Sequence, residues 1–170
     1  MLRLTTFNDR LEETHGFKLL NTINAMDYDN ILRPEGGTSL FDAVQSAVEA
    51  TKNYGEILTE QDFSVNAIVF IVTDGDDNSS RATAGSVKKA INDAIKSEQI
   101  DGITVVLVGV GEGSDSYLQD FQQKAGITQF VSIGEASPNK LAKLANFISR
   151  SISLTSQSLA DGTSSALLTF

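Results

Sequence analysis

The sequence predicts an α/β fold: a doubly wound, mostly parallel sheet with helices on both faces and an antiparallel hairpin at one edge. Short segments rich in Val and Ile, bounded by Gly, Asp or Ser, occur at residues 67–72, 103–108 and 129–133. Segments with helical periodicity lie between them. Strands that alternate with helices need crossover connections, and they therefore predict a parallel sheet that is buried on both faces.

Each element follows from the local pattern. At the start, LRLTTFND alternates apolar and polar residues and HGFKLL follows after a short acidic turn, which predicts the hairpin. In the expected helices the apolar residues fall on one face. These residues are Leu40, Phe41, Val44, Ala47 and Val48 within residues 39–52, then Val87, Ala90, Ile91, Ala94 and Ile95, then Tyr117, Phe121 and Ala125, and finally Leu141, Leu144, Ala145, Ile148 and Ile152.

Length and composition indicate one globular domain. The 170 residues suffice for a single ordinary core, which we expect over residues 1–155, with a Ser/Thr-rich tail at residues 156–170. The formal net charge of -9 disfavours nucleic acid and anionic membrane surfaces as partners and favours cations. The absence of cysteine excludes disulfides and thiolate chemistry, and the N-terminal residues show no signal-peptide pattern. We therefore expect a cytoplasmic protein.

An acidic turn, TDGDDNSS, directly follows the apolar segment at residues 67–72. In a parallel sheet, ligands bind where the strands end, and Asp74 lies at that point. Carboxylate and hydroxyl oxygens are the ligands that Mg²⁺, Mn²⁺ and Ca²⁺ prefer. The alternative is that these Asp, Asn and Ser residues only end the strand and cap a helix.

A second stretch, PEGGTSLFDAV at residues 34–44, places two glycines, Thr38 and Ser39 before an expected amphipathic helix. Its simplest interpretation is a helix N-cap. The free amides of a helix N-terminus also favour anions, but this stretch lacks the lysine of a phosphate-binding P-loop.

Taken together, the two stretches resemble the von Willebrand factor type A family. Gly-Gly-Thr-x-Leu-x-Asp-Ala opens a helix, and an apolar strand ending in Thr-Asp-Gly-x-Asp-Asn follows later. The resemblance extends through ITVVLVGVG and LAKLANFISRSIS, and it is closest to bacterial intracellular members. It implies a Rossmann-like fold with a metal-ion-dependent adhesion site. Thr38 and Asp74 would be metal ligands, with Ser39, Asp76 and Asp77 as further candidates.

One part of the family pattern is absent. The family's first strand ends in Asp-x-Ser-x-Ser, which supplies three of the five coordinating side chains, and no such motif precedes Thr38. The chain therefore resembles a domain truncated at its N-terminus, and it would leave a central strand position vacant. We expect the hairpin to pair directly with residues 67–72, another chain to donate a strand, or the terminal SALLTF to insert. The alternative is that the gene product is longer and that this chain is a fragment or a late start.

The resemblance implies a non-enzymatic protein-binding module, with a partial site for Mg²⁺ or Mn²⁺ that recognises a Glu or Asp of its partner. With two side-chain ligands the site would bind the cation weakly or not at all. One alternative is metal-independent assembly through an open sheet edge, including a strand-exchanged homodimer. Another is a metal-dependent hydrolase, disfavoured because no His, Cys or Lys accompanies the acidic turn.

Overall fold

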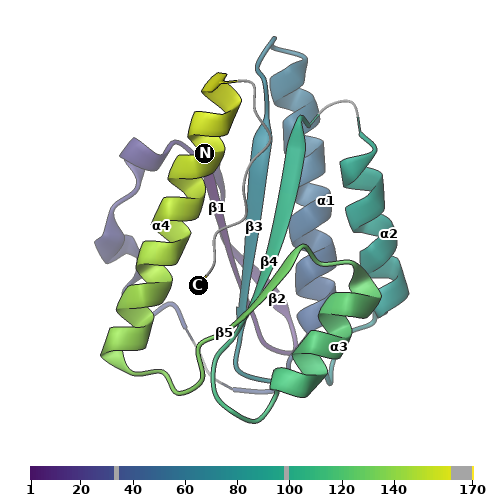
Figure 1. Ribbon diagram of the computed structural model, residues 1–170, viewed down its shortest axis with the longest axis vertical. Helices are drawn as coiled ribbons and strands as arrows, with labels where there is room; N and C mark the ends of the chain where they lie inside the picture. Colours follow the sequence, from purple (N-terminus) through teal and green to yellow (C-terminus); the bar gives the residue numbers. More distant parts are fainter. Residues whose placement is uncertain (33–34, 98–99, 162–169) are drawn as a thin grey trace.

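The structure is a computed structural model that describes residues 1–32, 35–97, 100–161 and 170, with only the backbone described for residues 159–161. It has an α/β fold (Figure 1). In chain order its strands and α-helices are β1 (Leu2–Phe7), β2 (Leu11–Lys18), α1 (Leu40–Thr59), β3 (Asn66–Thr73), α2 (Ala84–Ile95), β4 (Gly102–Gly109), α3 (Asp115–Ala125), β5 (Gln129–Ser132) and α4 (Pro138–Asp161). Two short 3-10 helices, η1 (Leu20–Thr22) and η2 (Ala25–Tyr28), follow β2.

The three predicted parallel strands are confirmed. They form one sheet in the order β3-β4-β5. β3 pairs with β4 along all eight residues, from Asn66 opposite Gly102 to Thr73 opposite Gly109, without a shift in register. β5 pairs with only the last four residues of β4. β4 is apolar along most of its length because helices cover both of its faces, as expected for the middle strand of a parallel sheet.

The four predicted helices are present, but two are longer than expected. α1 continues to Thr59, beyond residue 52, and there the ring of Tyr54 stacks on Phe17 of β2 at a centroid distance of 4.1 Å. α4 continues to Asp161, so the expected tail at residues 156–170 begins as helix. Of the terminal SALLTF, residues 165–169 lie outside the described part of the chain. No helix in the described part is long and apolar enough to cross a membrane.

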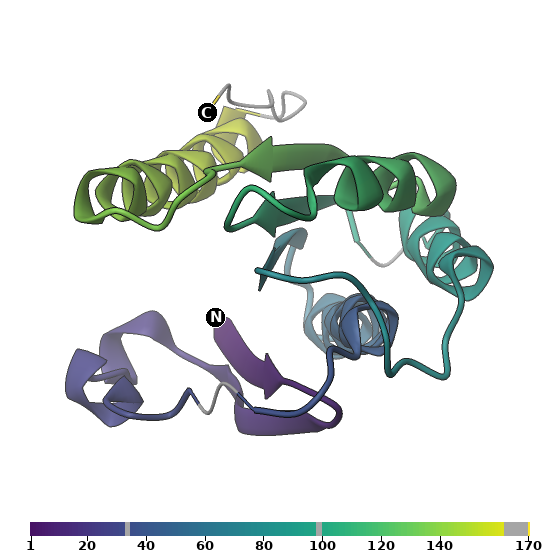
Figure 2. The ribbon, with the colours of Figure 1, turned by 90° about the horizontal axis from the view of Figure 1, so that it is seen from below.

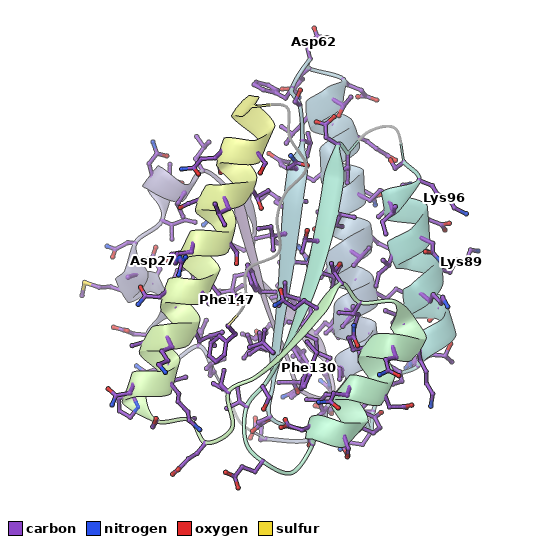
Figure 3. All side chains as sticks on the ribbon, in the orientation of Figure 1. Asp27, Asp62, Lys89, Lys96, Phe130 and Phe147 are labelled. Carbon is purple, nitrogen blue, oxygen red and sulfur yellow. The ribbon has the colours of Figure 1, made fainter. Side chains whose placement is uncertain are left out.

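Helices cover both faces of the parallel sheet (Figure 2). α1, α2 and α3 pack on one face around the buried side chains of Leu40, Val44, Ile91, Leu107 and Phe121. α4 packs on the other face, where Phe147 projects toward the sheet (Figure 3) and joins a smaller cluster with Val106, Val108, Val131, Ile133 and Leu144. The polar end of β3 lies where α1 and α2 both begin, and this places the candidate site.

The predicted antiparallel hairpin is confirmed, but its place in the fold differs from our expectation. β1 and β2 form a separate two-stranded sheet, and within the described residues neither strand pairs with β3. The hairpin is held instead by α1, through the Phe17–Tyr54 stack and through Phe7, which packs against the larger core. Direct pairing of the hairpin with residues 67–72 is therefore not seen.

Candidate functional site

The approach to helix α1 depends on two glycines for different reasons. Gly36 has a φ of +83°, which is in the left-handed region that favours glycine. At Gly37, an added Cβ would lie 2.0 Å from the hydroxyl of Ser79 and 2.6 Å from Oδ1 of Asn78. Gly37 therefore allows the segment before α1 to lie directly against the acidic turn after β3.

Thr38 is joined to that turn through its backbone. Its N–H donates to Oδ1 of Asn78 at 2.7 Å, and its carbonyl accepts from the N–H groups of Asn78 and Ser79 at 3.0 and 3.2 Å. Its hydroxyl oxygen lies 3.5 Å from the position that a Cβ on Gly75 would take. The structure thus brings the Thr38 hydroxyl close to Gly75, the residue that follows Asp74.

The acidic turn also caps helix α1. Ser39, at the N-cap position, makes no capping hydrogen bond with its side chain. Instead, Oδ1 of Asp77 accepts from the N–H of Phe41 at 3.2 Å, and the hydroxyl of Ser80 accepts from the N–H of Asp42 at 3.1 Å. The Ser80 hydroxyl in turn donates to Asp77. Asp77 therefore stabilises the N-terminus of α1, where a negative charge is favourable.

Asp42 makes the reciprocal connection, which our sequence analysis missed. Its carboxylate accepts from the N–H groups of Arg81 and Ala82 at 3.1 and 2.8 Å, just before α2 begins. Thr83 and Ser86 then cap α2 through a reciprocal pair of side chain to backbone hydrogen bonds. An acidic residue in the first turn of a predicted helix was the signal for Asp42, but its partners lie about 40 positions away in sequence, and no local rule identifies them.

The other candidate metal ligands, Asp74, Asp76 and Ser39, differ in how exposed they are. Asp74 and Asp76 are exposed, and within the described residues the carboxylate of Asp74 accepts no hydrogen bond. Ser39 is only 2% exposed, and its N–H donates to the carbonyl of Asn8 in the hairpin turn at 2.6 Å. Of these three residues, Asp74 has an exposed carboxylate and directly precedes Gly75, the residue against which the Thr38 hydroxyl lies.

The phenol of Tyr117, on α3, faces the acidic turn. Partial burial raises its pKa above the ordinary value, and the negative charges of Asp77 and Asp76 raise it further. These two charges act on Tyr117 because the turn lies close to α3 as well as to α1. The site is therefore a negatively charged surface at the junction of β3, α1 and α3.

Thr38 and Asp74 have the chemistry of hard-cation ligands but do not form a complete site. Hydroxyl and carboxylate oxygens suit Mg²⁺ and Mn²⁺, which need about six oxygen ligands in near-octahedral geometry. Asp77 is already engaged in capping α1. In the part of the chain that the structure describes, no three His, Cys, Asp or Glu side chains are grouped so that they could hold a metal ion. A resident ion is not supported by these residues alone.

Comparison with known proteins identifies no family: no family model matches the sequence, and none of the curated proteins is significantly similar to it.

Proposed function

We propose that this chain is a protein-binding module that recognises an acidic side chain of its partner through a divalent cation shared between them. The observation that supports the proposal is the approach of the Thr38 hydroxyl to Gly75 at the end of β3, next in sequence to Asp74, whose carboxylate is exposed. The two residues come from loops that are distant in sequence, and the hydrogen bonds between Thr38 and Asn78 hold these loops together.

The chain offers fewer oxygen ligands than the cation needs, so the partner must supply at least one. Thr38 and Asp74 provide one hydroxyl and one carboxylate, which are too few to offset the dehydration of Mg²⁺ or Mn²⁺. A Glu or Asp from the partner would add a second carboxylate to the same ion. Cation binding and partner binding would then strengthen each other, because each supplies what the other lacks.

Paramagnetic broadening by Mn²⁺ tests this site, because it detects weak binding. At roughly millimolar Mn²⁺ we expect the amide signals of Thr38 and Gly75 to broaden first. Asp74→Asn should abolish this selectivity, and N-acetyl-glutamate amide should enhance it in the unaltered chain. Asp93→Asn, on the exposed face of α2, removes the same charge elsewhere and is the matched control. Broadening that is the same in the Asp74→Asn and Asp93→Asn variants would show only general attraction to an acidic surface.

A second candidate function is metal-independent assembly through an open sheet edge. The observation that favours it is that β3 is the end strand of its sheet within the described residues, although its sequence is apolar on both faces. Strand addition to such an edge is a common mode of protein recognition.

We propose no catalytic activity. A metal-dependent hydrolase needs a general acid or base beside the cation. The single histidine, His15, lies on β2, where its ring contacts the hydroxyl of Tyr28 at 2.6 Å.

A further inference from the structure

β3 has the composition of a central strand. Its eight residues, NAIVFIVT, include no charged residue and no proline, and their register with β4 has no bulge. Val69 and Ile71 are buried against the larger core, while Ile68 and Phe70 pack against the smaller one. Continuous apolar sequence of this kind is typical of parallel strands that are buried on both faces, and it lacks the charges and prolines that are common on edge strands.

The backbone groups of β3 are paired on one side. The carbonyl of Val65, which precedes the strand, accepts from the N–H of Asp101, and the carbonyl of Thr73 accepts from the N–H of Val110, both at 2.8 Å. Because the direction of backbone groups alternates along a strand, those of the odd-numbered residues face β4. The backbone groups of Ile68, Phe70 and Val72 therefore face the opposite side, and within the described residues no strand is paired there.

In the two-stranded sheet, β2 has the features that protect an edge strand from pairing with another chain. β2 carries Glu12, Glu13 and Lys18, and its pairing with β1 contains two register shifts. Charged side chains and bulges are the usual devices that prevent an edge strand from pairing with another chain. β3 has neither device, so its edge is not protected against strand addition.

Among the described residues, no further strand or helix covers this edge. Val72, whose backbone faces the unpaired side, is 44% exposed. Both views place β1 on that side of β3, with no described helix or strand between them (Figures 1 and 2). On β1 itself the buried hydroxyl of Thr5 has no hydrogen-bond partner among the described residues. The unpaired backbone groups of β3 therefore face toward β1, which is the nearest described strand on that side.

We propose that the unpaired edge of β3 binds an extended segment of another polypeptide, about six to eight residues long and composed of uncharged β-branched and aliphatic side chains. The segment would lie between β3 and β1 and join the two sheets. This inference rests on the second candidate function and does not depend on the cation. A second copy of the chain is disfavoured as the donor, because two chains of net charge -9 repel each other and because its β3 is already joined to β4, whereas the segment would lie as a single strand between β3 and β1.

Amide hydrogen exchange with a synthetic peptide tests the proposal. The probe has seven Val, Ile and Thr residues between flanking lysine pairs, and the control peptide has the same charge with proline at its centre. We expect the probe to slow exchange at Ile68, Phe70 and Val72 by about tenfold or more, while Val69 and Ile71 are unchanged. Val72→Lys should weaken binding of the probe by about tenfold, whereas Val72→Thr should keep it within about twofold.

Three results would overturn the proposal in different ways. If Ile68, Phe70 and Val72 exchange as slowly as Val69 in the free monomer, the edge is covered and the assembly function fails as well. If sedimentation shows a dimer that Val72→Lys dissociates, assembly through the edge stands, but the occupant is a second copy. Equal binding of the probe and the proline peptide would mean that the lysines alone are responsible.

Discussion

The two faces of the parallel sheet differ in how completely helices cover them. On the face of α1, α2 and α3, fifteen of the described residues form one buried cluster, whereas on the face of α4 the cluster has six. On α4, the side chain of Leu141 is 45% exposed and that of Ile152 is 47% exposed. Buried apolar area is the main source of folding stability, so the first face contributes most of the stability and the second is more easily rearranged.

The acidic turn belongs to the well-covered face. It joins the N-termini of α1 and α2 through Asp77 and Asp42 and lies beside Tyr117 of α3. The unpaired edge of β3 lies beside the less covered face, where Val72 is exposed. The comparison therefore separates a candidate cation site beside the larger core from a candidate strand site beside the smaller core.

The largest expected effect comes from two phenylalanines, one in each core. Phe121 is 2% exposed in the larger cluster, where it stacks on Phe41 at 4.4 Å, and Phe147 is 5% exposed in the smaller one. Phe121→Ala should lower the free energy of unfolding by about 3–5 kcal/mol, and Phe147→Ala by at least about 1 kcal/mol less, because α4 can move to fill the cavity. Urea denaturation measures both, and equal losses would contradict the comparison.

The next effect concerns the hydrogen bonds that join α1 to the start of α2. Asp42→Asn leaves one side-chain oxygen where the carboxylate had two acceptors for Arg81 and Ala82. It should cost about 1–2 kcal/mol of unfolding free energy. Asp93→Asn, which removes an exposed charge from α2, should stay within about 0.5 kcal/mol. Thermal melting of both variants in the same buffer provides the measurement, and similar melting temperatures would show that the Asp42 hydrogen bonds contribute little.

Loss of a helix cap should also destabilise the protein more on the face of α2 than on the face of α4, but by a smaller amount. Thr83 accepts from the N–H of Ser86 at 3.2 Å within a reciprocal cap of α2, while Ser137, before α4, accepts from Lys140 at 3.4 Å. We expect Thr83→Ala to cost about 1 kcal/mol and Ser137→Ala about half of that or less. Chemical denaturation of the two variants checks the order, and a larger loss at Ser137 would reverse it.

The smallest effect is a pH dependence at Tyr117. The pKa of Tyr117 is raised in the folded chain, so folding favours the neutral phenol. The resulting contribution to the free energy of unfolding is fully present below the ordinary tyrosine pKa of about 10. This contribution should be lost as the pH rises through the higher pKa of the folded state. Absorbance titration of the phenols should show one step that Tyr117→Phe removes and that Asp76→Asn moves to lower pH. A step unaffected by Asp76→Asn would place the turn farther from α3.

Much of the fold could be predicted from the sequence because its elements carry strong local patterns. The three parallel strands begin and end within one residue of their expected bounds, since these runs are short, rich in Val and Ile, and bounded by polar residues or glycine. The end of α1 was placed too early because its last turns depend on the contact between Tyr54 and Phe17, which lies in a different element. The separation of the hairpin from the parallel sheet has no local signal at all.

The candidate site was predictable only in part, for a similar reason. Gly37 and Thr38 belong to a recognisable segment before a helix, and Asp74 to a recognisable strand end. The pattern does not show which carboxylates are engaged by backbone N–H groups. Asp77 is exposed in an isolated turn, yet in the folded chain it is the acceptor for Phe41, which only the packing of α1 against β3 determines.

The attachment of the hairpin has a consequence for partial unfolding. Isolated two-stranded hairpins are at best marginally stable in water, and this one is tied to the rest by α1 contacts and by the hydrogen bond from Ser39 to Asn8. We therefore expect residues 1–18 to detach more readily than the three-stranded core unfolds. Detachment of the hairpin would remove β1 from one side of the proposed strand site. The rate at which the hairpin detaches would then affect how readily that site binds or releases a segment.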